Sequence, residues 1–287
     1  MTRFRPLVVA GGCVALVLTV SLVLRAAFAG EMLISPIAFS VGSIEVHWYG
    51  IFIATSIAIG LPWTLRRIST STEYSPQLVE QVLWWSIGGG LVGARLIYVA
   101  QNLQSFLADP VSVLAVSSGG LSIHGMLLGS LIVAAVAAKA YRVDVRRVAD
   151  AAAPAILLGM SLGRFGNFTN MELIGTPTAV PWKMFIPELL RPVALEGAAY
   201  VHPIFLYDAL LNGMVLFVLL KTERSARFPG ELFLRFLVGI SLTRFVVEFV
   251  RLNDPPSSGG LSLAQIVSIG LGAVSLLLIV YGRRRLR

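Results

Sequence analysis

Eight long apolar runs leave this chain few ways to fold. They lie at about 7–28, 47–65, 79–101, 122–140, 151–168, 203–221, 231–250 and 261–281. A helix needs about 20 apolar residues to cross the hydrocarbon core of a bilayer, and a spanning helix satisfies its own backbone hydrogen bonds. Only 13% of the 287 residues are charged, against about 25% in soluble domains. The runs therefore predict an all-α, polytopic membrane helix bundle.

The basic residues indicate how such a bundle is oriented. Sixteen of the 23 lysines and arginines fall in five clusters between the runs: Arg3 and Arg5; Arg66 and Arg67; Lys139, Arg142, Arg146 and Arg147; Lys221, Arg224, Arg227 and Arg235; and Arg283, Arg284, Arg285 and Arg287. If the first cluster is cytoplasmic, threading eight spans returns the other four to the cytoplasmic side, as the positive-inside rule requires. The polar segments 102–123, 169–202 and 251–260 then face outward. The net charge of +8 thus indicates orientation and contact with anionic head groups, not nucleic-acid binding.

The chain is predicted to have two parts. Residues 1–30 form an extra hydrophobic segment, either a signal-like segment, because Ala27-Phe28-Ala29 fits a cleavage site, or an uncleaved anchor, which its long apolar run favours. Residues 31–287 form the membrane domain with seven core spans. Within it, the Pro- and Gly-rich segment 169–202 is expected to form a small external head. The single cysteine, Cys13, excludes both an internal disulfide and a cysteine metal cluster.

Topology leaves seven basic residues unexplained: Arg25, Arg95, Arg164, Lys183, Arg191, Arg244 and Arg251. Polar groups at membrane depth are costly and usually mark a substrate path or an active site. Arg164 lies near the end of the fifth run, with Asn167 and Glu172 shortly after it. Its planar guanidinium is suited to a lipid phosphate, although an Arg164–Glu172 ion pair could instead only tie a loop.

Arg244, Glu248 and Arg251 form a second charged group, at the end of the seventh run. Their i, i+4, i+7 spacing places them on one helical face. Ion pairing accounts for two of the three and leaves one arginine in surplus. A surplus cation in a membrane favours an anionic ligand.

Two further polar residues lie near the expected outer ends of spans. Glycines surround His124 and predict a bent, tightly approached backbone. His124 is either a general base near neutral pH or a structural interfacial histidine, and its residue type leaves both readings open. Tyr49 lies where the second run begins, as an aromatic belt residue would. These groups together indicate a site for an anionic lipid with one possible base.

Small residues punctuate the third and fourth runs. They are Gly88, Gly89, Gly90, Gly93, Gly125 and Gly129. Because small side chains let helix backbones approach each other in lipid, most of these glycines are expected to form close-packing helix faces.

From about Ile37 to the C-terminus the chain resembles the bacterial prolipoprotein diacylglyceryl transferase family. The matching motifs are Gly163-Arg164-Phe165-Gly166-Asn167-Phe168 through Asn170, Glu172 and Gly175, with His47-Trp48-Tyr49-Gly50, Gly120-Leu121-Ser122-Ile123-His124-Gly125, His202-Pro203, Leu206-Tyr207, Arg244-Phe245-Val246-Val247-Glu248-Phe249-Val250-Arg251 and Gln265-Ile266. Members move the diacylglyceryl group of phosphatidylglycerol onto the cysteine thiol of a lipoprotein precursor, forming a thioether and releasing glycerol phosphate. The resemblance implies a multi-pass enzyme of the bacterial inner (cytoplasmic) membrane, active toward its outer face, with a lipobox-containing precursor as partner and no cofactor or metal.

The resemblance also implies roles for single residues. Catalytic roles fall to His124, Tyr49, Arg244 and Glu248, and substrate-binding roles to Arg164, Asn167, Glu172, Gly175, His202 and Arg251. The two arginines Arg164 and Arg244 would hold and neutralise the phosphodiester. His124, with Tyr49, would help make the thiolate, since a thiol is a poor nucleophile.

The chain departs from the family pattern at five positions. Met126 stands where a glycine is usual, Thr176 where a basic residue is usual, Phe205 for Gln, Asp208 for Glu and Ile240 for Tyr. Since these changes remove polar groups around the arginines, the alternative is a lipid-binding paralogue with another donor or acceptor, or a lipid transporter using the same basic cavity. A transporter would be expected to show an internal repeat, and the sequence has none.

Overall fold

The computed structural model describes residues 18–42, 44–71, 74–114, 120, 122–195, 197–252 and 260–286. The chain divides into two compact units. The first contains Met1–Ser56, Leu157–Val218 and Leu237–Leu277, and the second contains Ile57–Ile156, Leu219–Phe236 and Leu278–Arg287.

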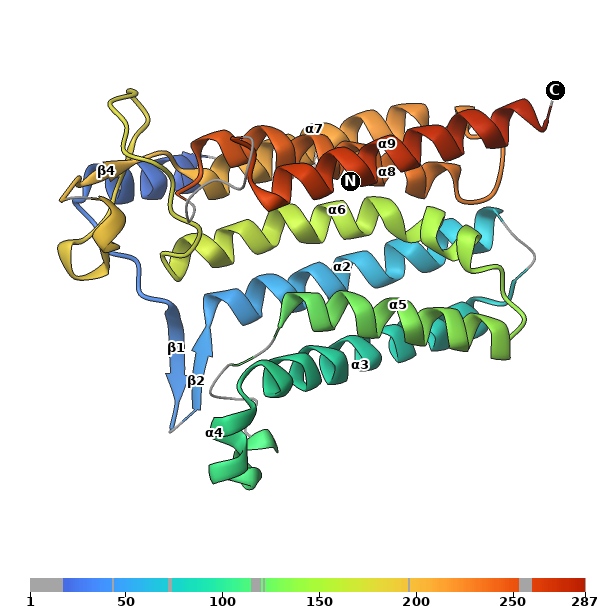
Figure 1. Ribbon diagram of the computed structural model, residues 1–287, viewed down its shortest axis with the longest axis horizontal. Coiled ribbons are helices and arrows are strands. Elements are labelled where there is room, and N and C mark those ends of the chain that lie inside the picture. The colour runs from blue at the N-terminus through green and yellow to red at the C-terminus, as the bar shows by residue number, and fades with distance from the viewer. Residues whose placement is uncertain are drawn as a thin grey trace, which may run out of the picture. The chain divides into compact units, whose positions relative to one another are not determined.

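Helices occupy all seven predicted core runs (Figure 1). They are α2 (Trp48–Ser71), α3 (Pro76–Gln101), α5 (Ile123–Ala140), α6 (Val145–Thr169), α7 (Ile204–Thr222), α8 (Glu231–Val247) and α9 (Leu263–Arg284). Five of them, α2, α3, α6, α7 and α9, are long and apolar enough to cross a membrane. Helix α8 has 17 residues, and within α5 the apolar stretch Gly125–Ala140 is also shorter. The count of seven spans therefore remains a prediction.

The predicted N-terminal segment is described only in part. A short apolar helix covers Leu18–Ala29. Residues 1–17, which include Arg3, Arg5 and Cys13, lie outside the described residues.

Two small antiparallel sheets were not predicted. Strands β1 (Ile37–Val41) and β2 (Ile44–His47) pair with Phe39 opposite Val46, and β2 leads directly into α2. Strands β3 (Met184–Phe185) and β4 (Tyr200–Val201) pair inside the 169–202 segment. Short helical turns complete the connections: α4 (Leu103–Ala108), η1 (Pro110–Leu114), η3 (Glu188–Leu190), η4 (Val193–Leu195), η5 (Glu223–Ser225) and η6 (Glu248–Val250).

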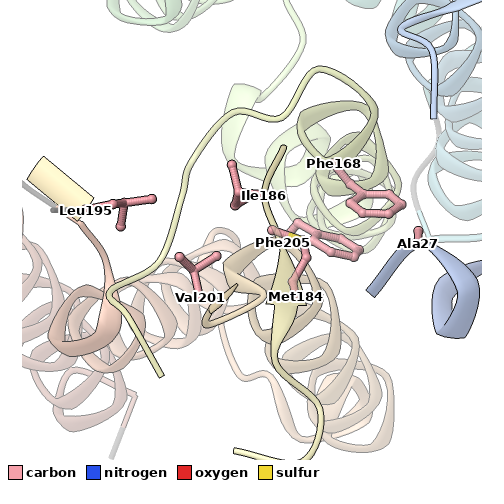
Figure 2. Close-up of a cluster of buried hydrophobic side chains, with 7 residues drawn as sticks. All are labelled: Ala27, Phe168, Met184, Ile186, Leu195, Val201 and Phe205. Atoms are coloured by element: carbon pink, nitrogen blue, oxygen red, sulfur yellow. The ribbon is translucent and has the colours of Figure 1, made fainter. Parts of the chain in front are cut away.

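A cluster of buried apolar side chains fixes the 169–202 segment to the helices of the first unit (Figure 2). Its members are Ala27, Phe168, Met184, Ile186, Leu195, Val201 and Phe205. The rings of Phe168, at the end of α6, and Phe205, at the start of α7, stack with centroids 4.3 Å apart. Phe205 is 2% exposed, so the apolar residue at this departure from the family pattern is part of the core. Offset aromatic pairs of this kind stabilise beyond the area that they bury.

In the second unit the predicted close-packing faces of α3 and α5 meet each other. A Cβ atom on Gly125 would lie 2.2 Å from the carbonyl oxygen of Gly93, and one on Gly129 would lie 2.3 Å from that of Gly89. The backbones meet so closely that only glycine fits, which confirms the prediction for these residues. Packing does not account for Gly88, where a Cβ would have no neighbour within 4 Å.

Candidate active site

The guanidinium of Arg164, on α6, faces a buried carboxylate on α7. Arg164 Nε lies 3.0 Å from Asp208 Oδ2, and the Asp208 side chain is only 2% exposed. Arg164 Nη1 also donates to Asn167 Oδ1 at 3.3 Å. Two edges of the guanidinium are thus held in place, while the side chain stays 22% exposed.

The turn after α6 carries the next predicted residue, Glu172. Its carboxylate accepts hydrogen bonds from Asn167 Nδ2 at 3.0 Å and from Asn170 Nδ2 at 3.1 Å. Both neighbours of Glu172 adopt left-handed backbone, with φ 51° at Met171 and 57° at Leu173. Such conformations are costly for side chains other than glycine and persist where the surroundings demand them. Glu172 is linked to Arg164 through Asn167, so the simple loop-tying ion pair is not what this turn forms.

Tyr49 lies against the α6 backbone. A Cβ atom on Gly166 would lie 2.2 Å from Tyr49 Cδ2, so the ring occupies the space that any other side chain at 166 would need. The Gly166 position of the motif is therefore explained by the approach of an aromatic ring.

Gly175 begins an extended segment that pairs with the chain at Arg251 and with the chain at Val201. It forms an antiparallel bridge with Arg251, while Pro177 bridges Val201. A Cβ on Gly175 would lie 2.3 Å from the carbonyl oxygen of His202. This close backbone packing connects the predicted residues Gly175, His202 and Arg251 in one small structure.

Arg244 and Glu248 form the ion pair that their spacing predicted, with Arg244 Nη2 2.8 Å from Glu248 Oε2. The predicted common helical face is wrong for Arg251. Helix α8 ends at Val247, the chain tightens into η6, and Arg251 is already extended. The backbone of Arg251 forms a bridge to Gly175 instead of a further helical turn.

Sequence reasoning missed Ser262, whose hydroxyl donates to Glu248 Oε1 at 2.9 Å. Ser262 precedes α9, and the backbone N–H of Gln265 donates to its Oγ at 3.2 Å. The Gln265 side chain accepts from the backbone N–H of Ser262 at 2.9 Å. This reciprocal capping box has a sequence signature, Ser-x-x-Gln before an apolar run, that could have located Ser262.

Five charged side chains interact as one group, defined here as the charge cluster: Arg164, Arg244, Arg251, Asp208 and Glu248. Three cations face two carboxylates, so the cluster carries one surplus positive charge. Burial first, and then the positive charge of Arg244, lower the pKa of the Arg251 guanidinium. Arg244 Nη1 is buried and has no hydrogen-bond partner among the described residues. A buried donor and a surplus cation both favour an anion at this place.

His202 belongs to a chain of ring contacts beside the cluster. Its Nδ1 lies 3.1 Å from the Tyr207 hydroxyl, which also accepts a hydrogen bond from Trp182 Nε1 at 2.7 Å. These contacts tie the 169–202 segment to the first turns of α7.

His124 is the second residue of α5, in the second unit, and its side chain lies outside the described residues. The predicted bent backbone before it is confirmed at Gly120, which has φ +76° and where a Cβ would lie 2.5 Å from the Tyr98 ring. The Arg95 guanidinium fixes the backbone at Gly120 by donating to its carbonyl oxygen at 2.9 Å, and it also donates to the carbonyl oxygen of Ser112 at 2.6 Å. The role of His124 itself remains a prediction.

The seven unexplained basic residues thus separate into groups. Arg164, Arg244 and Arg251 join the charge cluster. Others make structural contacts, since Lys183 Nζ lies 4.3 Å from the centre of the Tyr200 ring and Arg191 Nε donates to the Ile186 carbonyl at 2.9 Å. Within the described ranges, no group of three or more His, Cys, Asp or Glu side chains could hold a metal ion.

Comparison with known sequences gives one consistent result. Residues 36–281 match the family described as prolipoprotein diacylglyceryl transferase. The chain is 38% identical over 248 residues to the phosphatidylglycerol–prolipoprotein diacylglyceryl transferase of Acaryochloris marina, covering 84% of this chain and 89% of that protein. The proteins of the same name from Thermosynechococcus vestitus and Synechococcus elongatus are 37% identical over 245 residues and 34% identical over 258 residues. These alignments cover 84% and 87% of this chain, and 91% and 89% of the relatives.

Proposed function

We propose that this chain, which belongs to the prolipoprotein diacylglyceryl transferase family, transfers the diacylglyceryl group of phosphatidylglycerol to the cysteine thiol of a lipoprotein precursor. The observation that carries this proposal is the charge cluster, in which three arginines face two carboxylates. A phosphodiester is the anion in this reaction, and its charge would balance the surplus cation.

The arginines have a defined task in this chemistry. Arg244 Nη1, which has no partner in the described part of the chain, would donate to a phosphate oxygen, and Arg164 would contribute its remaining N–H groups. As the glycerol carbon–oxygen bond breaks, negative charge collects on the departing glycerol phosphate. Donors already aimed at that charge lower the barrier without reorganising. Glu248 and Asp208 would act as positioning residues that hold the two guanidiniums.

The thiol supplies the nucleophile. Its sulfur would form a bond to the glycerol carbon while the carbon–oxygen bond to phosphate breaks, giving a thioether and glycerol phosphate. The thiol proton must leave first or in the same step, and we assign it to His124, assisted by Tyr49. Asn167, Glu172, Gly175 and His202 would shape the lipid and peptide entrance beside the arginines.

The reaction requires access to the outer face of the bacterial cytoplasmic membrane. We assign Glu31 and the 169–202 segment to the outside, and Arg66, Arg146, Arg224 and the C-terminus to the cytoplasm, because this arrangement places every basic cluster inside. Asn253, which would also face outward, lies outside the described residues.

Expression of the chain in a bacterial strain depleted of its own transferase tests this function. We expect the unmodified precursor of a major lipoprotein to disappear and its lipidated form to return. A lipid transporter would instead move labelled phosphatidylglycerol across proteoliposomes and leave the precursor unmodified, which would overturn the proposal.

A further inference from the structure

A second basic site lies in the second unit, apart from the residues of the charge cluster. A pocket of about 540 Å³ opens between the end of α2, the beginning of α6, η5 and the loop that leads into α8. Its charged lining consists of Arg67, Arg147, Arg224, Arg227, Asp150 and Glu223. Four guanidiniums therefore share the pocket with two carboxylates.

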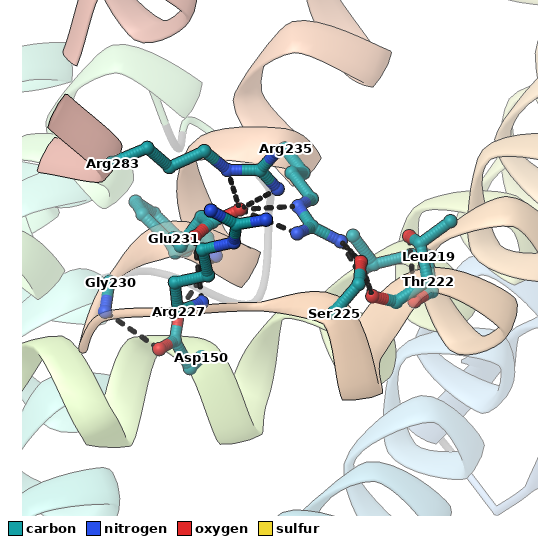
Figure 3. A network of polar contacts seen from close by, with 10 residues as sticks. Asp150, Leu219, Thr222, Ser225, Arg227, Gly230, Glu231, Arg235 and Arg283 are labelled. Atoms are coloured by element: carbon teal, nitrogen blue, oxygen red, sulfur yellow. Dashed lines mark hydrogen bonds and ion pairs between the residues drawn. The ribbon is translucent and has the colours of Figure 1, made fainter. Parts of the chain in front are cut away.

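Both carboxylates are already engaged. Glu223 Oε2 lies 2.7 Å from Arg67 Nη1. Asp150 accepts two backbone hydrogen bonds, from Gly230 N at 2.7 Å and from Phe233 N at 2.8 Å. Figure 3 shows the Asp150 contact holding the loop before α8. These contacts fix the pocket wall. Glu223 is paired with Arg67, and the single charge of Asp150 faces three further arginines, so the lining keeps a net positive charge.

The next carboxylate, Glu231, is also occupied. It is fully buried and receives Arg235 and Arg283, whose Nε atoms lie 3.1 and 2.9 Å from Glu231 Oε1 (Figure 3). The backbone N–H of Arg227 donates to its other oxygen at 2.8 Å. This network anchors the backbone of Arg227, which also lines the pocket.

Three guanidiniums remain, those of Arg147, Arg224 and Arg227. In the part of the chain that the structure describes, no carboxylate forms an ion pair with any of them. Guanidiniums bind phosphate oxygens through paired N–H groups, and basic pockets between membrane helices bind anionic head groups. The apolar side chains Phe228 and Leu232 line the same pocket. That apolar wall suits an amphiphile better than a free ion.

We infer that this pocket is a binding site for a phosphate group carried by an anionic phospholipid. The pocket shares no residue with the charge cluster, so a lipid bound there would not be the lipid that reacts in the transfer. Under the proposed topology, the lipid would belong to the cytoplasmic leaflet, opposite the face assigned to transfer.

Native mass spectrometry of the purified full chain with phosphatidic acid tests the site. The variant Arg224→Ala/Arg227→Ala removes two guanidiniums whose side chains make no ion pair among the described residues. The matched control, Arg66→Ala/Arg284→Ala, removes two exposed arginines of the same unit that do not line the pocket. Both variants keep Arg164 and Arg244, so lipid bound at the candidate active site is common to them. Their thermal unfolding is compared with that of the parent to confirm folding.

We expect the pocket variant to bind phosphatidic acid at least about tenfold more weakly, since each basic residue near an anionic lipid contributes roughly fivefold. The control should change binding by less than about threefold, because exposed charges are screened by salt. Phosphatidylcholine should bind all three proteins weakly. Equal losses in both variants, or no loss in either, would overturn the proposal. Displacement of the lipid by millimolar glycerol 3-phosphate would show that the pocket serves a soluble phosphate compound, which contradicts the assigned lipid.

Discussion

Arg164 Nε and Asp208 Oδ2 lie 3.0 Å apart, with the aspartate 2% exposed and the arginine partly open. A buried carboxylate beside a partly exposed guanidinium fixes the direction of the arginine while leaving some of its N–H groups available. The family resemblance leads us to expect a glutamate at position 208, and Asp208 supplies the same carboxylate on a side chain one methylene shorter.

Asp208→Asn should impair transfer more than it impairs lipid binding. The amide removes the charge that orients Arg164, and a displacement of about 1 Å at a reacting centre can cost about 100-fold in rate. We expect kcat to fall about 10- to 100-fold with a smaller change in KM. Asp208→Glu, which keeps the carboxylate, serves as the control and should retain most activity. Equal loss in the Glu and Asn variants would show that Asp208 only packs the helix pair.

Arg164→Lys should fail although it preserves the positive charge. A lysine cannot reach both Asp208 and Asn167 while presenting further donors to a phosphate, because its ammonium is a single point charge. We expect a loss of more than about tenfold in kcat/KM, comparable to removing an oriented donor. Turnover near that of the parent would mean that Arg164 acts only as a charge.

The helices could be predicted from the sequence because long apolar runs leave the backbone few alternatives in lipid. The strands β1 to β4 could not, because they have only two to five residues each. The pairing of β3 with β4 also joins residues about 15 positions apart in the sequence. The same limit explains Arg251. Its i+7 spacing from Arg244 predicted a shared helical face, but the pairing with Gly175, distant in sequence, ends the helix first.

The charged residues of the candidate site could be predicted from the sequence, but the residues that they contact could not. Arg164, Arg244 and Glu248 stood out because they are charged residues in apolar runs. Asp208 was noticed only as a departure from a family pattern, since nothing local reveals that it faces Arg164 on another helix. Phe205 could be placed only by its ring contacts with Phe28, Phe165 and Phe168. Among the other departures, Met126 Cγ would lie 3.4 Å from a Cβ on Gly90, and the Thr176 hydroxyl donates to the Val250 carbonyl at 3.3 Å. Nothing in the structure explains Ile240.

Gly166→Ala should destabilise the site, whereas Gly163→Ala should not. At 166 the new methyl group would collide with the Tyr49 ring, but at 163 it would meet no atom within 4 Å. Overpacking typically costs about 1–3 kcal/mol, while a glycine replaced by alanine in an open helix position gains up to about 1 kcal/mol. Thermal unfolding and transfer rate measured on both variants check this. Equal behaviour of the two would contradict the assigned Tyr49–Gly166 contact.

Cysteine labelling tests the proposed orientation. In a Cys13→Ala background, Leu189→Cys, whose parent residue is 98% exposed, should react with a membrane-impermeant reagent in intact cells. Arg146→Cys should react only after the membrane is opened. Labelling of residue 146 from outside would refute the topology.

His124→Ala should abolish transfer while changing phosphatidylglycerol affinity by no more than a few fold. A histidine with a pKa near its usual value of about 6.5 can accept the proton of a thiol whose pKa is about 8.5. The rate of the parent should therefore fall as the pH drops through the histidine range. His124→Gln keeps a donor and an acceptor but cannot take that proton. Near-normal turnover of the Gln variant would exclude the base role and move proton transfer to Tyr49, water or the phosphate.

The most direct measurement is the mass of a lipobox peptide after incubation with the purified chain and phosphatidylglycerol. We expect one diacylglyceryl group on the cysteine sulfur and release of an equal amount of glycerol phosphate. For Arg244→Ala, which removes an oriented phosphate donor, we expect a rate at least about 100-fold lower. A peptide that stays unmodified with the folded parent chain, or that is modified equally well by Arg244→Ala, would contradict the account.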